Sequence, residues 1–278
     1  MKKLIALVLA LAMLGSLFVM AAGAEEKKEL NTVTPGVLTV ATSPDFAPYE
    51  FYSLDEEGNP TLAGFDIALA KYIADYLGLE LEIIPMDFDG TLMELAAKNV
   101  DISMAGYSPD PTREDKMDFS DIYYLGGQSF VTVKGNEDKF PTLEATNNPD
   151  YQIGAQLGSI QVNLAKENSP EADIVELSKV TDIIAELLAG HLDGAYIETA
   201  VAESYAKNYP ELAIVLEVPY DQAGSAVGVS KGNAELLAAI NEAIAAALAD
   251  GSMDAFVTEA NELNSGEKYE GLLENMAD

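Results

Sequence analysis

Residues 63–90 read AGFDIALAKYIADYLGLELEIIPMDFDG and combine a helical pattern with a strand-like one. In the helical part, the apolar side chains of one face are Phe65, Leu69, Tyr72, Ile73 and Tyr76. The run Leu81–Pro85 that follows has the length and composition of a buried strand. A helix followed directly by a strand is part of a βαβ unit, so this stretch predicts an α/β fold.

The alternation of strands and helices continues on both sides of that stretch. A strand is expected at Val37–Ala41, a helix near Gly90–Lys98 and a strand at Asp101–Ala105. A second series follows from Tyr151, with expected strands at 153–155, 174–177 and 194–197 and expected helices from 159 and over 181–189. This order predicts mostly parallel sheets with helices between the strands.

The C-terminal part completes the pattern. A strand is expected at Ala226–Val229, followed by helices at Ala234–Asp250 and Met253–Leu263. Gly251 stands directly after the first of these helices, where a left-handed glycine commonly ends a helix. The sequence shows no repeat of about 20 to 50 residues and no long linker, so we expect two α/β lobes joined by short crossings.

The N-terminus has the form of a secretory signal. Lys2 and Lys3 precede an apolar run that ends in the small residues Ala22-Gly23-Ala24. These are the parts of a cleaved signal peptide, which we place at residues 1–24. A membrane anchor is the alternative, but charged residues follow the run at once, and no later segment has the ~18 apolar residues of a spanning helix. We therefore expect export to the periplasm or the exterior.

The chain is strongly acidic and has no cysteine. It contains 47 acidic residues and 15 basic ones, for a formal net charge of −32. Such a charge argues against nucleic acid and anionic lipid as partners. A preference for a cationic ligand would also fit, but acids spread along every helix are typical of a solvated surface. Without cysteine we expect neither disulfides nor a lipid anchor attached through that residue, and we expect a monomer.

The motifs of several common enzyme classes are absent from the sequence. It contains a single histidine and no Gly-x-Ser-x-Gly, phosphate loop or Gly-x-Gly-x-x-Gly motif. Metal clusters built on histidine, and Ser-His or Cys-His dyads, therefore lack their parts except around His191 itself. His191 lies in GHLDG between a predicted helix and a predicted strand, where a surface position is the more usual one. We expect no catalytic residue, no metal site and no cofactor.

The segment AGYSPDPTREDKMDFS, residues 105–120, follows a predicted strand and contains candidates for binding an anion. Arg113 lies on a loop or a first helical turn, and a guanidinium can bind a carboxylate through two parallel hydrogen bonds. Gly106 allows a backbone to approach a ligand closely, and Ser108 offers a hydroxyl. An arginine followed by two acidic residues is often only a surface charge, so this pattern alone leaves both roles open.

This segment resembles a signature of extracellular solute-binding protein family 3, the amino-acid-binding proteins of ABC importers. The signature contains Gly-x-Thr/Ser, then Glu-Arg, then Phe-Ser, and in this chain Thr112 precedes the arginine. The resemblance extends through LTVATSPDFAPYEF (38–51), AGFDIALAKYIADYLGLELEIIPMDFDG (63–90), KNVDISMAGYS (98–108), DFSDIYY (118–124) and LDGAYIETAVAESY (192–205). Several motifs in the same order are more specific than any one of them.

The resemblance implies a type II periplasmic-binding-protein fold, in which two α/β lobes close on a ligand in the cleft between them. Lobe 1 is expected to comprise residues 25–125 and 224–278, and lobe 2 residues 126–223. Two crossings, near 125–130 and near 220–225, would form the hinge. The implied function is to capture a free α-amino acid and deliver it to the membrane permease of an ABC importer.

The resemblance also implies contacts for the ligand carboxylate on the first lobe. Arg113 resembles the family arginine that binds this carboxylate. Ser108 and the backbone of Ala105 and Gly106 are expected beside it. Arg113 is thus the residue on which the residue-level reasoning and the resemblance agree.

Contacts from the second lobe are implied as well. Residues 155–161, AQLGSIQ, resemble a turn that offers amides and a hydroxyl to the same carboxylate at Ser159 and Ile160. Free N–H groups at a helix N-terminus suit that role, although Ser159 alone would indicate only an N-cap. Glu198 stands where the family places an acid, usually Asp, that receives the ligand ammonium. By itself it would indicate a helix N-terminal acid, and the two roles are compatible.

The side-chain pocket follows from five further positions. Phe46 and Phe88 match positions whose rings usually sandwich the ligand side chain, although each would otherwise count as core. Ser43 occupies a position that is often Asp in members that bind polar or cationic side chains. Gln156 and Gln161 could reach the ligand from the second lobe. This combination favours an uncharged polar or modestly apolar side chain, with arginine or lysine as competitors and an anionic side chain last.

Two other functions remain open from the sequence. Some relatives resemble cyclohexadienyl dehydratases, and an enzyme on this fold would need an acid or base over the ligand, for which Glu198 or Glu50 could serve. A sensory or receptor-presenting module is the second alternative. An arginine, hydroxyls and a carboxylate suit the binding of a zwitterion without its transformation, so we expect a binding protein and not an enzyme.

Overall fold

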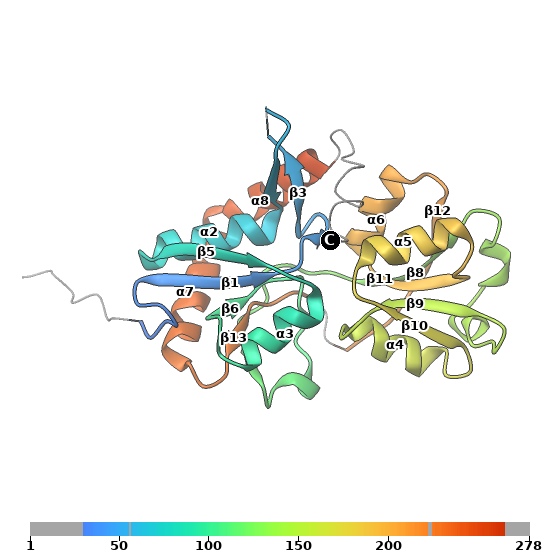
Figure 1. Ribbon diagram of the computed structural model, residues 1–278, viewed down its shortest axis with the longest axis horizontal. Helices are drawn as coiled ribbons and strands as arrows, with labels where there is room; N and C mark the ends of the chain where they lie inside the picture. The colour runs from blue at the N-terminus through green and yellow to red at the C-terminus, as the bar shows by residue number, and fades with distance from the viewer. Residues whose placement is uncertain (1–29, 56, 222–223, 265–278) are drawn as a thin grey trace, which may run out of the picture. The chain divides into compact units, whose positions relative to one another are not determined.

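The computed structural model describes residues 30–55, 57–221 and 224–264 (Figure 1). Two five-stranded sheets and one three-stranded sheet, with helices packed on them, form a mixed α/β architecture, as predicted. The predicted signal peptide, residues 1–24, and the C-terminal end of the predicted first lobe, residues 265–278, lie outside the described residues.

The first five-stranded sheet has the strand order β5-β1-β6-β13-β7. Its strands are β1 (Val37–Thr42), β5 (Glu80–Pro85), β6 (Ile102–Ser103), β7 (Met117–Phe119) and β13 (Gly228–Ser230). β1 pairs in parallel with β5 and β6, whereas β13 runs antiparallel to β6 and β7. The prediction of a mostly parallel sheet is therefore wrong at this edge. β13 comes from the C-terminal part of the chain and enters the sheet between β6 and β7, antiparallel to both, so it belongs to no βαβ unit.

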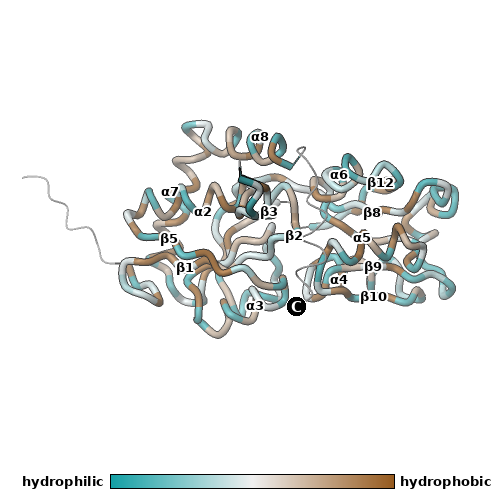
Figure 2. Tube along the Cα trace, turned by 45° about the horizontal axis from the view of Figure 1, so that its top comes forward, coloured by the Kyte–Doolittle hydropathy of each residue, from teal (hydrophilic) through white to brown (hydrophobic). Residues whose placement is uncertain are grey.

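Helices lie on both sides of the first sheet. α3 (Phe88–Ala96) contacts β1, β6 and β13, while α2 (Phe65–Leu77) contacts β5, and Figure 1 shows α2 and α3 on opposite sides of β1. On the α3 side, Leu95 packs with Ala41, Val100 and Met117 in a buried cluster. Figure 2 shows the hydrophobic character of β1, which runs through the middle of this core.

Two C-terminal helices complete this part of the molecule. α7 (Ala234–Asp250) and α8 (Ser252–Asn264) pack on α2 and on each other. α7 ends at Gly251, whose φ of 81° is the left-handed conformation predicted for it. Within the described ranges no single helix is long and apolar enough to cross a membrane. The consecutive helices α7 and α8 are bent by 78° relative to each other. Only when taken together are they long and apolar enough for a membrane span, by length and composition alone.

The second five-stranded sheet has the strand order β10-β9-β11-β8-β12. Its strands are β8 (Gln128–Val133), β9 (Gln152–Gln156), β10 (Asp173–Leu177), β11 (Gly194–Glu198) and β12 (Leu212–Glu217). β9 pairs in parallel with β10 and β11, and β8 runs antiparallel to β11 and β12. This sheet is mixed in the same way as the first, with its antiparallel pairs at one side.

Three helices pack on the second sheet: α4 (Ile160–Asn168), α5 (Val180–Ala189) and α6 (Thr199–Asn208). Ile153 and Ala155 of β9 share a buried cluster with α4, whereas a Cβ on Gly154 would meet Ile183 of α5. Because side chains alternate along a strand, α4 and α5 cover opposite faces of β9. The sequence indicated a helix after Glu198 but not its bounds, because the buried residues of α6 are Val201, Ala202 and Ser204, which give a weak apolar stripe.

A three-stranded antiparallel sheet, β2 (Asp45–Phe46), β3 (Glu50–Leu54) and β4 (Pro60–Ala63), lies between β1 and α2 in the chain. These strands were not predicted, because they follow one another without helices between them, whereas the prediction rested on strands that alternate with helices. The register pairs Phe46 with Glu50. This small sheet therefore brings a predicted site residue next to a buried acid.

Two chain segments connect the five-stranded sheets, one between β7 and β8 and the other between β12 and β13. An antiparallel bridge joins Tyr124 to Ser225, and the Ser225 N–H donates to the Tyr124 carbonyl at 2.7 Å. The Tyr220 hydroxyl also donates to the Gly126 carbonyl at 3.3 Å. The two crossing segments are thus hydrogen-bonded to each other. Residues 222 and 223 of the second predicted crossing lie outside the described residues.

Gly64, at the start of α2, makes a backbone approach that a larger residue would prevent. Its φ is 117°, and a Cβ there would lie 2.1 Å from the Tyr49 carbonyl oxygen. Gly190 at the end of α5 is a matched control, because its φ is 74° and a Cβ there would meet nothing within 4 Å. Both positions disfavour L side chains, but only Gly64 adds a clash with backbone atoms.

We expect Gly64→Ala to lower the free energy of unfolding by at least about 2 kcal/mol more than Gly190→Ala does. Urea denaturation of both variants and of the unchanged protein measures the difference. Equal losses for the two variants would show that the close contact at Gly64 is unimportant.

Candidate functional site

Arg113, the single arginine of the chain, is positioned by a short helical turn, η1 (Pro111–Arg113). The Asp110 carboxylate accepts a hydrogen bond from the Thr112 N–H at 2.8 Å and so caps the turn. Pro111 suits the first position because its φ is fixed and it lacks an N–H that would need a partner. The turn holds Arg113 with only 9% of its surface exposed.

A buried guanidinium needs hydrogen-bond acceptors, and Arg113 finds few. Its Nη2 donates to the Gly158 carbonyl at 2.7 Å, and its guanidinium carbon lies 5.9 Å from the ring centres of both Phe88 and Tyr107. Burial lowers the pKa of Arg113. Among the residues that the structure describes, no carboxylate lies within 4.0 Å of its nitrogens. Most of its N–H donors therefore remain for another group.

The N-terminus of α4 lies in the same neighbourhood, because Gly158 immediately precedes Ser159. Ser159 is the N-cap of α4, but its side chain makes no capping hydrogen bond. Its buried Oγ has no hydrogen-bond partner among the described residues. Ile160 is the first helical residue, and a first-turn N–H has no acceptor within the helix. The guanidinium, the hydroxyl and these amides together form a place suited to an anion.

The backbone between β6 and η1 carries three more predicted contacts, Ala105, Gly106 and Ser108, all little exposed. Gly106 has a φ of 60°, and a Cβ there would lie 2.7 Å from a ring carbon of Phe46. Glycine is thus what allows the Phe46 ring to rest against this backbone. The Gly106 N–H is already engaged, since it donates to Asp66 Oδ2 at 3.1 Å.

The rings of Phe88 and Tyr107 form a second wall beside Arg113. Their centres lie 5.2 Å apart in an edge-to-face arrangement. The Tyr107 hydroxyl is hydrogen-bonded to Ser103 Oγ at 2.9 Å and also to Thr91 Oγ1. These bonds fix Tyr107 between β6 and α3. In the sequence, Tyr107 was marked only by its place between Gly106 and Ser108. Its contact with the Arg113 guanidinium became visible only in the structure.

Glu198 ends β11 and is the N-cap of α6. Its Oε2 accepts from the Val201 N–H at 2.9 Å, and its Oε1 accepts from the Gly127 N–H at 3.4 Å. The side chain is 3% exposed, and burial raises the pKa of Glu198 to about 7, although these hydrogen bonds oppose the shift. The helix N-terminal role is therefore present. Contact with a ligand stays a prediction.

The other predicted polar contacts have protein partners. The Ser43 hydroxyl donates to Asp45 Oδ1 at 2.8 Å, and Gln156 Nε2 donates to Asp45 Oδ2 at 3.3 Å. Gln161 Nε2 donates to Gln128 Oε1 at 2.8 Å. Ser43 and Gln156 thus meet at Asp45, which was not among the predicted site residues. Gln161 instead lies beside Gln128, whose partner in the sheet register is Glu198.

Two fully buried carboxyl groups, Glu50 and Asp66, lie close to the Gly106 backbone. Asp66 Oδ1 accepts from the Tyr123 hydroxyl at 2.7 Å, and burial raises the pKa of Asp66 to about 6. Burial, and then the negative charges of Asp66 and Asp45, raise the pKa of Glu50 well above its usual value. We therefore expect Glu50 to stay protonated above the usual glutamate pKa of 4.5. A proton on Glu50 would let it donate to Asp66, and without that proton neither Glu50 oxygen has a hydrogen-bond partner among the described residues.

No group of three or more His, Cys, Asp or Glu side chains that could hold a metal ion occurs in the part of the chain that the structure describes. The site therefore consists of hydrogen-bonding groups and rings. Its polar groups come from β6 and η1 on one side and from α4 and β11 on the other.

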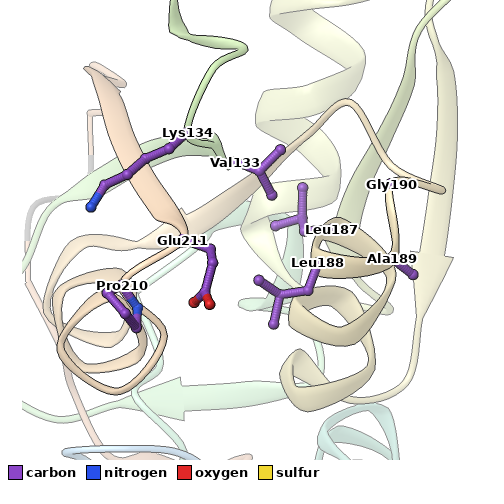
Figure 3. A pocket seen from close by; sticks show the side chains of 8 residues that line it. All are labelled: Val133, Lys134, Leu187, Leu188, Ala189, Gly190, Pro210 and Glu211. Carbon is purple, nitrogen blue, oxygen red and sulfur yellow. The ribbon is translucent and has the colours of Figure 1, made fainter.

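A separate surface pocket is lined by Val133, Lys134, Leu187, Leu188, Ala189, Gly190, Pro210 and Glu211 (Figure 3). It lies where β8 and α5 end and β12 is about to begin. None of the predicted site residues lines it. Its charged side chains, Lys134 and Glu211, are exposed, so it offers no buried polar group for orienting a small molecule.

Residues 38–259 match the model of the bacterial extracellular solute-binding proteins, family 3. The chain belongs to this family. The match confirms the resemblance found in the sequence and, with the structural likeness below, the type II periplasmic-binding-protein fold.

The family relatives include both binding proteins and an enzyme. The arginine-binding extracellular protein ArtP of Bacillus subtilis is 34% identical over 74% of this chain and 79% of ArtP. The cyclohexadienyl dehydratase of Pseudomonas aeruginosa is 29% identical over 79% of this chain and 81% of that protein. Membership of the family alone therefore does not exclude catalysis.

A solved structure is similar over most of its length. It is that of AbpA, an amino acid ABC transporter substrate-binding protein from Streptococcus pneumoniae, bound to L-arginine. The TM-score is 0.79 at 32% identity, covering 84% of this chain and 97% of AbpA. The fold that positions Arg113, Ser159 and Glu198 is thus one in which a relative has been seen with an amino acid bound.

The buried acid Glu50 generates a prediction about stability. Above the usual glutamate pKa of 4.5, Glu50 ionises in the unfolded chain while the folded protein keeps it protonated. Unfolding then releases a proton, so this group lowers stability as pH rises from about that value towards its raised folded pKa. Glutamine has the same shape and cannot ionise.

We therefore expect Glu50→Gln to raise the melting temperature near neutral pH, with a gain that shrinks as pH falls towards 4.5, the usual glutamate pKa. Thermal unfolding followed by circular dichroism at both pH values measures it. Asp75→Asn, a change of the same type at an exposed position of α2, is the control and should give no such trend. A loss of stability near neutral pH would mean that Glu50 is ionised when folded.

Proposed function

We propose that this protein binds a free α-amino acid outside the cytoplasm and presents it to the permease of an ABC importer. The observation that carries the proposal is the buried guanidinium of Arg113, which has no carboxylate partner among the described residues. The Ser159 hydroxyl nearby is buried and unpartnered too. One ligand carboxylate would supply acceptors to both groups. Membership of the family and the arginine-bound AbpA support the same function.

In the proposed complex each end of the ligand has its own partners. The carboxylate binds the groups around the Arg113 guanidinium, namely Ser108, Ser159, the Ile160 amide and the backbone of Ala105, whereas the N–H of Gly106, the other backbone contact expected from the sequence, donates to Asp66. The α-ammonium pairs with Glu198, which is then ionised. The side chain lies between Phe46 and Phe88. An amino acid suits this arrangement because it carries both charges at fixed spacing.

For the side chain we place arginine first, ahead of glutamine. Ser43, Gln156 and Gln161 favoured a ligand with a neutral side chain when only the sequence was considered. In the structure, however, all three side chains are hydrogen-bonded to protein partners. Aromatic rings can hold a guanidinium at ~0.5–2 kcal/mol, and the many buried acids favour a cation. ArtP and AbpA, whose names or structures record arginine, support this order. Glutamate remains last.

The proposed lobes are residues 25–125 with 224–278, and residues 126–223. The strands of each five-stranded sheet come from one of these groups. The two crossings, bonded to each other at Tyr124 and Ser225, would form the hinge. Closure then brings Arg113 and Glu198 onto the same ligand.

The remaining parts of the proposal concern export and chemistry. Export would use the signal peptide at residues 1–24, and without cysteine the mature protein has no thiol for a lipid anchor. We propose a monomeric binding protein with no catalytic role. The dehydratase relative makes turnover worth checking, so any bound ligand should be recovered and identified unchanged after incubation.

Calorimetric titration with arginine, glutamine, leucine and glutamate tests the function. We expect arginine to bind most tightly and glutamate least. Arg113→Ala should weaken binding of every ligand by roughly 100-fold or more, because removing one partner of a buried charge pair costs ~3–5 kcal/mol.

Lys116→Ala is the matched control, since it removes an exposed positive charge three residues away and should leave affinity unchanged. Circular dichroism confirms that each variant is folded. Binding by Arg113→Ala within about threefold of the unchanged protein would refute the carboxylate site. Glutamate as the tightest ligand would refute the account of the side-chain pocket.

Glu198 predicts a pH-dependent affinity. Its pKa is about 7 in the free protein, and an ammonium beside the ionised carboxylate lowers that pKa in the complex. The affinity for the ligand is therefore highest above this pH and falls as the pH drops through it, by up to about tenfold per pH unit. Glu198→Gln should bind more weakly near neutral pH and lose this dependence. An unchanged pH profile in the variant would separate Glu198 from the ligand ammonium.

A further inference from the structure

Helix α5 receives its N-terminal cap from a distant part of the chain. Its own N-cap residue, Lys179, makes no side-chain capping hydrogen bond. The Val180 N–H donates instead to Asp45 Oδ2 at 2.6 Å, across 135 positions of sequence. First-turn N–H groups need acceptors from outside the helix, and a carboxylate is a strong one because the helix dipole also favours negative charge there.

Asp45 has further partners from the second sheet and its helices. Gln156, at the end of β9, donates to Asp45 Oδ2 at 3.3 Å, and the Tyr205 hydroxyl of α6 donates to the Asp45 main-chain carbonyl at 3.0 Å. Ser43, which lies two residues before Asp45 in the chain, donates to Asp45 Oδ1 at 2.8 Å. Three elements of the second sheet's assembly thus converge on one residue of β2.

These bonds form only while β2 and α5 are together. Asp45 belongs to the part of the chain that precedes the first crossing, whereas Gln156, Val180 and Tyr205 all lie between the two crossings. Asp45 is 8% exposed in this arrangement. Separation of the two parts would return its carboxylate to water and leave the Val180 N–H without a protein acceptor.

We propose that Asp45 is a latch between the lobes, which caps α5 across the cleft and stabilises the closed form without contacting the ligand. The inference rests on the proposed function, because it assumes that closure accompanies binding. A contact made only in the closed form shifts the equilibrium towards closure whatever the ligand is. The latch should therefore add to affinity equally for amino acids with different side chains, and Asp45 is a positioning residue.

The rival role for Asp45 is a direct partner of a cationic ligand side chain. The two roles differ in what a substitution does. Loss of a side-chain partner weakens arginine binding and spares glutamine, whereas loss of a latch weakens both by the same factor. Asp45→Asn keeps an acceptor oxygen and removes the charge, and Asp45→Ala removes both, so a latch predicts the larger effect for alanine.

Hydrogen exchange of the Val180 amide in the full chain, without ligand and with saturating arginine, tests the latch directly. We expect arginine to slow exchange of this amide in the unchanged protein, and at arginine saturation we expect it to exchange at least about tenfold faster in Asp45→Ala, with Asp45→Asn between them. Asp75→Asn and Asp75→Ala, at an exposed aspartate of α2, are the matched controls and should leave the rate unchanged. Equal rates in the unchanged protein and Asp45→Ala would overturn the proposal.

Titration of the same variants with arginine and with glutamine supplies the second test. We expect Asp45→Asn to weaken both ligands by the same factor, within about twofold, and Asp45→Ala to weaken both further. A loss confined to arginine would overturn the latch in favour of the side-chain role. Should the unchanged protein bind no amino acid, the proposed function fails and the latch fails with it, whereas an unchanged protein that binds arginine no more tightly than Asp45→Ala does refutes the latch alone.

Discussion

A guanidinium held out of water without an internal counter-charge is the constraint on which the site depends. The chain carries a net charge of −32 and a single arginine, yet among the described residues no acid pairs with Arg113. The turn that holds it, the rings beside it and the end of α4 surround a charge whose desolvation is offset only in part. A ligand carboxylate would supply that counter-charge, so the desolvated guanidinium favours the binding of an anion.

The fold could be predicted from sequence where burial leaves a strong period. α2 was predicted at its observed residues, and so was α7 with its terminal glycine, because each buries one apolar face. The direction of a strand leaves no such period, so the prediction of a mostly parallel sheet failed at the antiparallel strand β13, and the short strand β7 was not predicted at all. The small sheet formed by β2, β3 and β4 was missed because its strands follow one another without the intervening helices on which the prediction relied.

In the candidate site, contacts between residues close in sequence could be predicted, whereas contacts between distant residues could not. The capping position of Glu198 follows from its place between a strand and a helix, and the structure has it there. The partners of Ser43 and Gln156 could not be predicted, because both bonds end on Asp45 and the second spans 111 positions. Side chains that look available in a sequence can already be bound within the protein, and only the tertiary structure shows it.

The bridge between the two crossing segments has a mechanical consequence. The Tyr124–Ser225 bridge and the bond from the Tyr220 hydroxyl to Gly126 tie the two connections to each other at two places. Two tied connections can bend together without breaking these bonds, whereas sliding of one connection past the other would break them. The bonds would therefore favour a hinge-like rotation of the two sheets over a sliding motion.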